Sequence, residues 1–161
     1  MSTIAAAVQD IVADIAPEEV DLIPTVTRGF YDSAASRRAT VQGVLLGKGH
    51  DAALGFGAIE TGQLVASITL IVFNGVATNM LSGMTERKLT GLGRWAARRR
   101  LARQLTTAAP QAEAAPLPKL TPTEADAIAG LVKHLARTNG LSDDVGTRLA
   151  INLAAKLIGA S

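Results

Sequence analysis

The residues that could carry out chemistry are few and lie far apart in this sequence. There are two histidines, His50 and His134, and no cysteine, which excludes disulfides, thiolate metal sites and cysteine nucleophiles. We expect His50 in a loop beside Asp51, and His134 at the edge of a helix. No pair of carboxylates stands at helical spacing in an apolar setting. The sequence therefore predicts a non-enzymatic protein with no cofactor, no metal site and no evident small-molecule substrate.

The strongest concentration of charge is a basic run near the middle of the chain. Seven of the 16 lysines and arginines lie between residues 87 and 103, where there is no acid: Arg87, Lys88, Arg94, Arg98, Arg99, Arg100 and Arg103. Trp95 lies among them. Cations with a tryptophan indicate contact with anionic lipid headgroups or with an acidic protein partner. No interleaved aromatic residues accompany them, so a nucleic acid is not expected as a partner. The simpler alternative is a solvated helix face or a basic tether.

A long uncharged segment precedes the basic run, and the rest of the chain must be arranged around it. Residues 61–85 contain no ionisable side chain and lie between Glu60 and Glu86. A helix of this length, rising about 1.5 Å per residue, could cross a hydrocarbon core of about 30 Å. The segment is either the buried central helix of a bundle or a membrane-crossing segment with a basic cytoplasmic flank. We predict an all-α fold, a helical bundle around this segment.

The polar side chains of the uncharged segment form a seam. On a helical wheel, four of them fall within about 60° of one another: Gln63, Ser67, Asn74 and Thr78. Such a polar seam suits a buried helix that touches solvent along one narrow edge. It also suits a membrane helix that hydrogen-bonds to a partner helix or lines a pore-forming oligomer.

The same segment also supports a β interpretation. Asn74-Gly75 between apolar runs is a strong signal for a hairpin turn, and residues 66–72 alternate at the period of a half-buried strand. A β-hairpin at 64–82 is therefore the alternative fold. The helix is preferred because an isolated hairpin is marginal in water and the flanking segments are predicted to be helical.

The first 46 residues are predicted to form several helices. Apolar spacing indicates a helix at 4–15, with a hydroxyl residue before it as N-cap. Pro17 and Pro24 each begin a further short helix, and Ser33 caps a helix that reaches about residue 46. Six of the 14 acids lie in residues 1–32. They are most simply a solvated face, and alternatively an acidic docking surface.

The run DAALGFG at 51–57 carries a resemblance to other proteins. Followed by an apolar segment, a basic run, a proline- and alanine-rich stretch and a final pair of helices, this D-x-x-LGFG run resembles a group of small actinobacterial helical proteins of uncharacterised function. The resemblance implies a helical accessory protein. It assigns no activity and no site residue.

The last third of the chain is predicted to be a linker and a helical hairpin. Residues 106–120 contain three prolines and no apolar stripe, which is typical of a semi-rigid linker after a helical domain at 1–105. In residues 121–161, Thr121 begins a capping box, Asn139-Gly140 ends the first helix and Ser142 caps the second. Two short helices cannot bury a core alone, so this αα-hairpin must dock on the first domain, on a second copy or on a partner.

Two functions follow from this organisation. The first is a helical adaptor or accessory protein that docks protein partners, or copies of itself, through its C-terminal hairpin and basic run. The alternative is a membrane-inserted anchor or pore-forming oligomer that uses residues 61–85. The start of the chain lacks the cationic residues of a secretory leader. We therefore expect a bacterial protein in the cytoplasm or at the inner face of the cell membrane.

Overall fold

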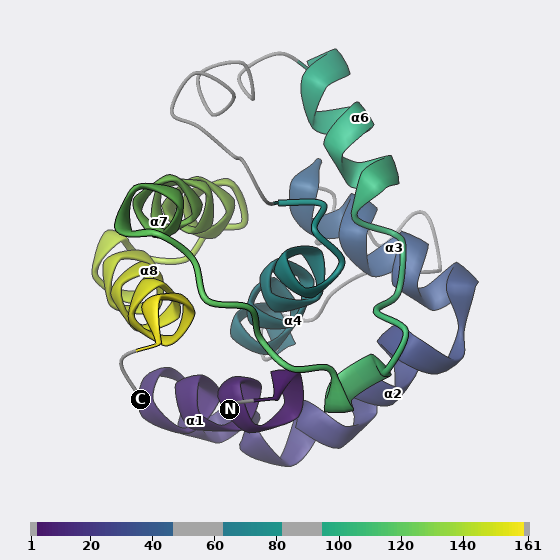
Figure 1. Cartoon of the computed structure of the whole chain (residues 1–161), viewed down its shortest axis with the longest axis horizontal. Helices are drawn as coiled ribbons and strands as arrows, with labels where there is room; N and C mark the ends of the chain where they lie inside the picture. The colour runs from purple at the N-terminus through teal and green to yellow at the C-terminus, as the bar shows by residue number, and fades with distance from the viewer. Residues whose placement is uncertain (1–2, 47–62, 82–94, 160–161) are drawn as a thin grey trace.

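The computed structural model describes residues 3–46, 63–81 and 95–159, and every regular element in these ranges is a helix (Figure 1). The prediction of an all-α fold is confirmed for this part of the chain. In order, the elements are α1 (Ile4–Ile15), η1 (Pro17–Leu22), α2 (Ile23–Asp32), α3 (Ala34–Leu45), α4 (Leu64–Ala77), α6 (Trp95–Gln104), η5 (Ala112–Ala114), α7 (Pro122–Thr138) and α8 (Asp143–Ile158).

The helices near the N-terminus begin at the expected caps. The Thr3 hydroxyl accepts a hydrogen bond of 3.2 Å from the Ala6 N–H, and the Ser33 hydroxyl accepts one of 3.1 Å from the Ser36 N–H. Each bond satisfies one of the amide groups that the first turn of a helix leaves without a partner. The boundaries of α1 and α3 therefore follow from local sequence.

Helix α4 is the centre of the bundle, with α1, α2, α3 and α7 packed against it. Every residue from Leu64 to Val76 is buried. The helix is shorter than the predicted segment of 61–85, because Thr78–Leu81 forms a turn and residues 61–62 and 82–85 lie outside the described ranges. The narrow solvent-exposed edge expected for a core helix is not found between Leu64 and Val76.

The alternative of a β-hairpin at 64–82 is wrong, because Asn74 and Gly75 lie inside α4. Both residues serve tertiary packing instead of a turn. Asn74 is fully buried and hydrogen-bonded, and the missing side chain of Gly75 leaves room for Leu81 and Leu105. A Cβ atom on Gly75 would lie 2.7 Å from Leu105 Cδ2. Close approach, and not a turn, explains this glycine.

Helix α6 lies at the periphery of the bundle and packs on α3 (Figure 1). Leu101, Ala102 and the following Leu105 are buried. The predicted helix of the basic run is therefore found, and one apolar side of it joins the common core.

The segment 106–120, predicted to be a linker, connects α6 to α7 in the chain. It runs along the bundle. The Ile4 N–H donates a hydrogen bond of 3.0 Å to the Ala115 carbonyl, and the Leu120 N–H donates one of 2.8 Å to the Leu157 carbonyl. Leu117 is buried. The segment therefore contacts both ends of the chain.

Helices α7 and α8 form the predicted αα-hairpin. Thr121 and Glu124 make the capping box at the start of α7, and Gly159 ends α8 with a φ of 87°. A Cβ atom on Gly146 would lie 3.1 Å from the Cβ of Ala136, so a glycine here lets the two helices approach closely. The hairpin packs on α1, α3 and α4 and shares one hydrophobic cluster with them.

Candidate functional site

The predicted contact residues of the basic run are only partly described. Arg87, Lys88 and Arg94 lie outside the described ranges, and Trp95 is the first residue of α6. The remaining members lie on α6, where Arg99, Arg100 and Arg103 are exposed and Arg98 is half-buried.

The exposed arginines of α6 form a one-signed surface. No acidic residue occurs in α6. Within the described ranges, no carboxylate forms an ion pair with Arg100 or Arg103. Because the opposite side of α6 is buried against α3, the helix is held with these arginines facing solvent. This geometry suits an anionic macromolecular surface.

The one histidine in the described ranges lies on the hairpin. His134 of α7 is half-buried, and its pKa is lowered by burial and by the charges of Arg98 and Arg137. Sequence reasoning placed His134 at a helix edge, which agrees with its half-burial, but did not connect it to the basic run.

The predicted polar seam faces the interior of the protein. Asn74 has no exposed surface. Its Oδ1 accepts hydrogen bonds of 2.9 Å from the Tyr31 hydroxyl and from the Ala109 N–H, and its Nδ2 donates one of 2.7 Å to the Thr107 carbonyl. This single side chain therefore joins α4 to α2 and to the segment that follows α6.

The other seam residues have local roles. Gln63 is half-buried at the N-cap position of α4 and makes no capping hydrogen bond with its side chain. Ser67 is buried. The Thr78 hydroxyl donates to the Asn74 carbonyl at 2.9 Å, which closes the C-terminal end of α4.

The missing cap of α4 is supplied by Glu19, a residue that sequence reasoning assigned to a solvated acidic face. Glu19 is 3% exposed, and its carboxylate accepts hydrogen bonds from the Ala66 N–H at 3.0 Å and the Val65 N–H at 3.4 Å. An apolar helix that begins without Ser, Thr, Asp or Asn must find an acceptor elsewhere in the fold. The missing N-cap residue before α4 was the one signal in the sequence that such an acceptor would be needed.

Burial raises the pKa of the Glu19 carboxyl and of the Tyr31 hydroxyl. Desolvation raises the pKa of Glu19 to about 7, because it outweighs the two backbone hydrogen bonds that stabilise the carboxylate. Burial, with the charge of Glu113, also raises the pKa of Tyr31 well above its usual range. Glu19 contacts the N-terminal end of α4 and Tyr31 contacts a residue near its C-terminal end, so the two groups do not converge on one site.

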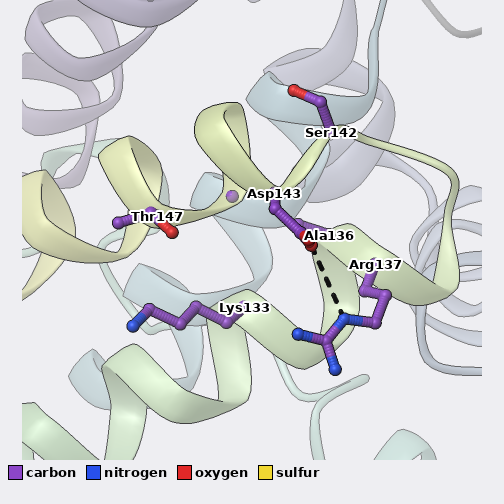
Figure 2. Close-up of a pocket in the computed structure, with 7 residues that line it drawn as sticks. Lys133, Ala136, Arg137, Ser142, Asp143 and Thr147 are labelled. Atoms are coloured by element: carbon purple, nitrogen blue, oxygen red, sulfur yellow. Dashed lines mark ion pairs between the residues drawn. The ribbon is translucent and has the colours of Figure 1, made fainter.

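A polar pocket of about 270 Å³ lies on the hairpin between α7 and α8 (Figure 2). The lining residues are Lys133, Ala136, Arg137, Ser142, Asp143, Gly146 and Thr147. Arg137 Nε lies 3.7 Å from Asp143 Oδ1, and both side chains are largely exposed. This pocket was not predicted. Within it, the Arg137 cation of α7 meets the Asp143 carboxylate of α8.

Two further findings concern the described ranges. They contain no cluster of three or more histidine, aspartate and glutamate side chains that could hold a metal ion. No helix within them is both long enough and apolar enough to cross a membrane.

Comparisons with protein-family models, with curated proteins and with solved structures found no match. The D-x-x-LGFG run at 51–57 lies outside the described ranges, so the resemblance based on it stays a prediction.

Proposed function

We propose that this protein is a non-enzymatic helical adaptor that docks an acidic protein partner through α6 and the C-terminal hairpin. The observation that carries the proposal is the exposed arginine surface of α6, which has no acid of its own. Lys133 adds an exposed cation on the hairpin, and Arg137, also exposed, pairs with Asp143. Charge of one sign on a rigid helix favours rapid and selective association with an acidic partner.

The described interior supports an adaptor more than an enzyme. Two of its buried polar side chains hold the bundle together: Glu19 caps α4, and Asn74 joins three segments. The pocket on the hairpin is lined by Lys133, two hydroxyl side chains and the ion pair of Arg137 with Asp143.

The alternative function, a membrane-inserted anchor or pore formed by residues 61–85, has less support. The 14 residues of α4 span about 21 Å at 1.5 Å per residue, short of a hydrocarbon core of about 30 Å. Insertion of this helix would require the bundle to open, because its residues are buried among α1, α2, α3 and α7.

Charge reversal on α6 tests the adaptor function. Three proteins would be immobilised, and the proteins that each of them retains would be quantified. They are the wild type, Arg100→Glu/Arg103→Glu and the control Arg28→Glu, which changes an exposed arginine of α2. We expect a partner retained by the wild type and by Arg28→Glu, lost from the α6 variant, and released near 1 M salt, where the Debye length is about 3 Å. Equal retention by all three proteins would contradict the proposal. Recovery of the wild type in a carbonate-resistant membrane pellet would favour the alternative.

A further inference from the structure

The charges of the chain are divided between two separate surfaces. Residues 1–32 contain six acids and a single base, Arg28, whereas α6 contains arginines and no acid. Helix α6 packs on α3 at one edge of the bundle, and α1 with the η1 segment that follows it lies at the opposite edge (Figure 1). The acidic and the basic surface therefore do not meet within one molecule.

On the acidic surface, the carboxylates that remain available lie on η1. Asp10 of α1 pairs with Lys156 of α8 at 2.8 Å, and the Asp14 carboxylate accepts a hydrogen bond of 3.4 Å from another side chain of α8. Glu18 and Asp21 are exposed, and within the described ranges neither forms an ion pair with a basic side chain. Side chains three positions apart lie above one another on a 3₁₀-helix, about 6 Å apart along its axis at 2.0 Å per residue. The two carboxylates therefore share one side of η1.

The arginines of α6 have the matching spacing. Arg100 and Arg103 also stand three positions apart, so they are neighbours on the surface of an α-helix, with about 5–6 Å between their Cβ atoms. Both are exposed, and in the part of the chain that the structure describes neither pairs with a carboxylate. Leu101 and Leu105 bury the other side of this segment, so the two arginines face away from the bundle. Two cations and two carboxylates at similar spacing can form two ion pairs side by side.

We propose that the exposed arginine surface of α6 docks on η1 of a second copy of this chain, with Arg100 and Arg103 against Glu18 and Asp21. This inference rests on the proposed function and identifies the acidic partner as the protein itself. Contact of α6 with α6 is disfavoured, because it would bring like charges together. Complementary charge selects the acidic surface of the second copy instead.

The geometry of this contact determines the kind of assembly. It joins two different surfaces, so a copy that binds through its α6 keeps its own η1 free for a third copy. A contact of this heterologous kind generates a ring or an open chain of subunits. Because α6 and η1 lie at opposite edges of the bundle, we expect an open chain. Exposed ion pairs are weak and screened by salt, so the chain should form at high protein concentration and low ionic strength.

Sedimentation velocity of the purified protein over a series of concentrations tests the proposal. At about 0.01 M salt, where the Debye length is about 30 Å, the average mass of the wild type should continue to rise with concentration beyond that of a dimer. Near 1 M salt, where the Debye length is about 3 Å, it should return to the mass of the monomer.

Charge reversal on either surface should prevent association, and reversal on both should restore it. Arg100→Glu/Arg103→Glu and Glu18→Arg/Asp21→Arg each bring like charges together, so each should weaken association at least about tenfold. The protein with all four substitutions should associate again, because opposite charges then face each other in reversed order. An equimolar mixture of the two double variants should associate for the same reason.

A matched control separates the acidic surface from net charge. Asp126→Arg/Asp144→Arg changes two exposed acids of the hairpin and alters the net charge as much as Glu18→Arg/Asp21→Arg does. It should associate like the wild type. Recovery in the protein with all four substitutions also shows that the double variants lose association through charge, since a misfolded surface would not regain it.

The outcomes distinguish this inference from the adaptor function. A wild type that stays monomeric, a mass that stops rising at that of a dimer, or equal association by Glu18→Arg/Asp21→Arg and its control would overturn the inference. If the immobilised wild type retains a different protein that Arg100→Glu/Arg103→Glu loses, while the purified chain stays monomeric, the inference fails and the adaptor function stands. Retention of no protein at all, this chain included, would contradict both.

Discussion

The Tyr31 hydroxyl donates a hydrogen bond of 2.9 Å to Oδ1 of Asn74, which joins α2 to the centre of the bundle. The same oxygen accepts from the Ala109 N–H, so one buried amide holds two other segments in place. The tyrosine ring also packs edge-on against Phe30, with 5.1 Å between the ring centroids. Asn74 therefore links α2 and the segment after α6 to the central helix.

Asn74→Leu should lower the free energy of unfolding by about 3 kcal/mol, because the Tyr31 hydroxyl, the Ala109 N–H and the Thr107 carbonyl all lose their partner. Urea denaturation would measure the change. Tyr31→Phe removes only one of these bonds and should cost about 1 kcal/mol. In the Asn74→Leu background, Tyr31→Phe should cost less than it does alone. Additive effects of the two substitutions, or a more stable Asn74→Leu protein, would show that Asn74 is not the shared acceptor.

The two glycines Gly75 and Gly29 should respond to alanine in opposite directions. In α4, a Cβ atom on Gly75 would lie 2.7 Å from Leu105 Cδ2 and 2.9 Å from Leu81 Cδ1. Overpacking of this kind costs about 1–3 kcal/mol, which exceeds a gain in helix propensity of about 1 kcal/mol. In α2, Gly29 has nothing within 4 Å of that position.

We therefore expect Gly75→Ala to lower the melting temperature and Gly29→Ala to raise it, both measured by circular dichroism. The leucines that Gly75→Ala would displace are almost fully buried, so they have little room to move aside. A Gly75→Ala protein as stable as Gly29→Ala would mean that Leu81 and Leu105 repack without cost.

The parts of the fold that could be predicted depend mostly on local sequence signals such as helix caps. Thr3, Ser33, Thr121 and Ser142 each cap the helix expected of them, because a cap depends on residues three positions away. The burial of α4 was predictable from its lack of charge. What could not be predicted is which distant group meets each polar atom of that helix.

Glu19 and Asn74 illustrate the limit. Glu19 caps a helix that begins more than 40 residues later, and Ala109 reaches Asn74 from 35 residues away. No periodic pattern in the sequence indicates such a long-range hydrogen bond. The hydrogen bond from Asn139 to the Val44 carbonyl has the same origin, because the two residues are 95 positions apart. The exposed arginines of α6 were predicted because the prediction needs only the concentration of basic residues in this part of the sequence.

Glu19 should make the protein less stable as the pH rises. Its carboxyl pKa is about 7 in the folded state, against an ordinary value of 4.5 that applies to the unfolded chain. Between these values the folded state binds more protons than the unfolded state. The stability contributed by Glu19 is therefore fully present below about pH 4.5 and is lost as the pH rises through about 7. The neighbouring charge of Glu18 acts in the same direction.

Glu19→Gln lacks this titration while its amide oxygen can still accept from Ala66. We expect its free energy of unfolding, relative to the wild type, to increase between about pH 5 and pH 8 in urea denaturation series. Asp21→Asn, which changes an exposed acid of η1, should keep the pH dependence of the wild type. A difference between Glu19→Gln and the wild type that does not vary with pH would show that Glu19 stays ionised in the folded protein.

The hairpin of α7 and α8 should not fold without the rest of the bundle. Its buried residues, among them Leu131, Val132 and Leu153, belong to the same hydrophobic cluster as α1 and α4, and Asn139 donates to the Val44 carbonyl of α3. A peptide of residues 119–161 should therefore show weak helical circular dichroism and no cooperative melting, since so few residues bury too little apolar surface. Adding a fragment of residues 1–118 should restore helicity, because it supplies the surface on which the hairpin packs. A cooperative transition in the peptide alone would contradict this dependence and would make the hairpin an autonomous module.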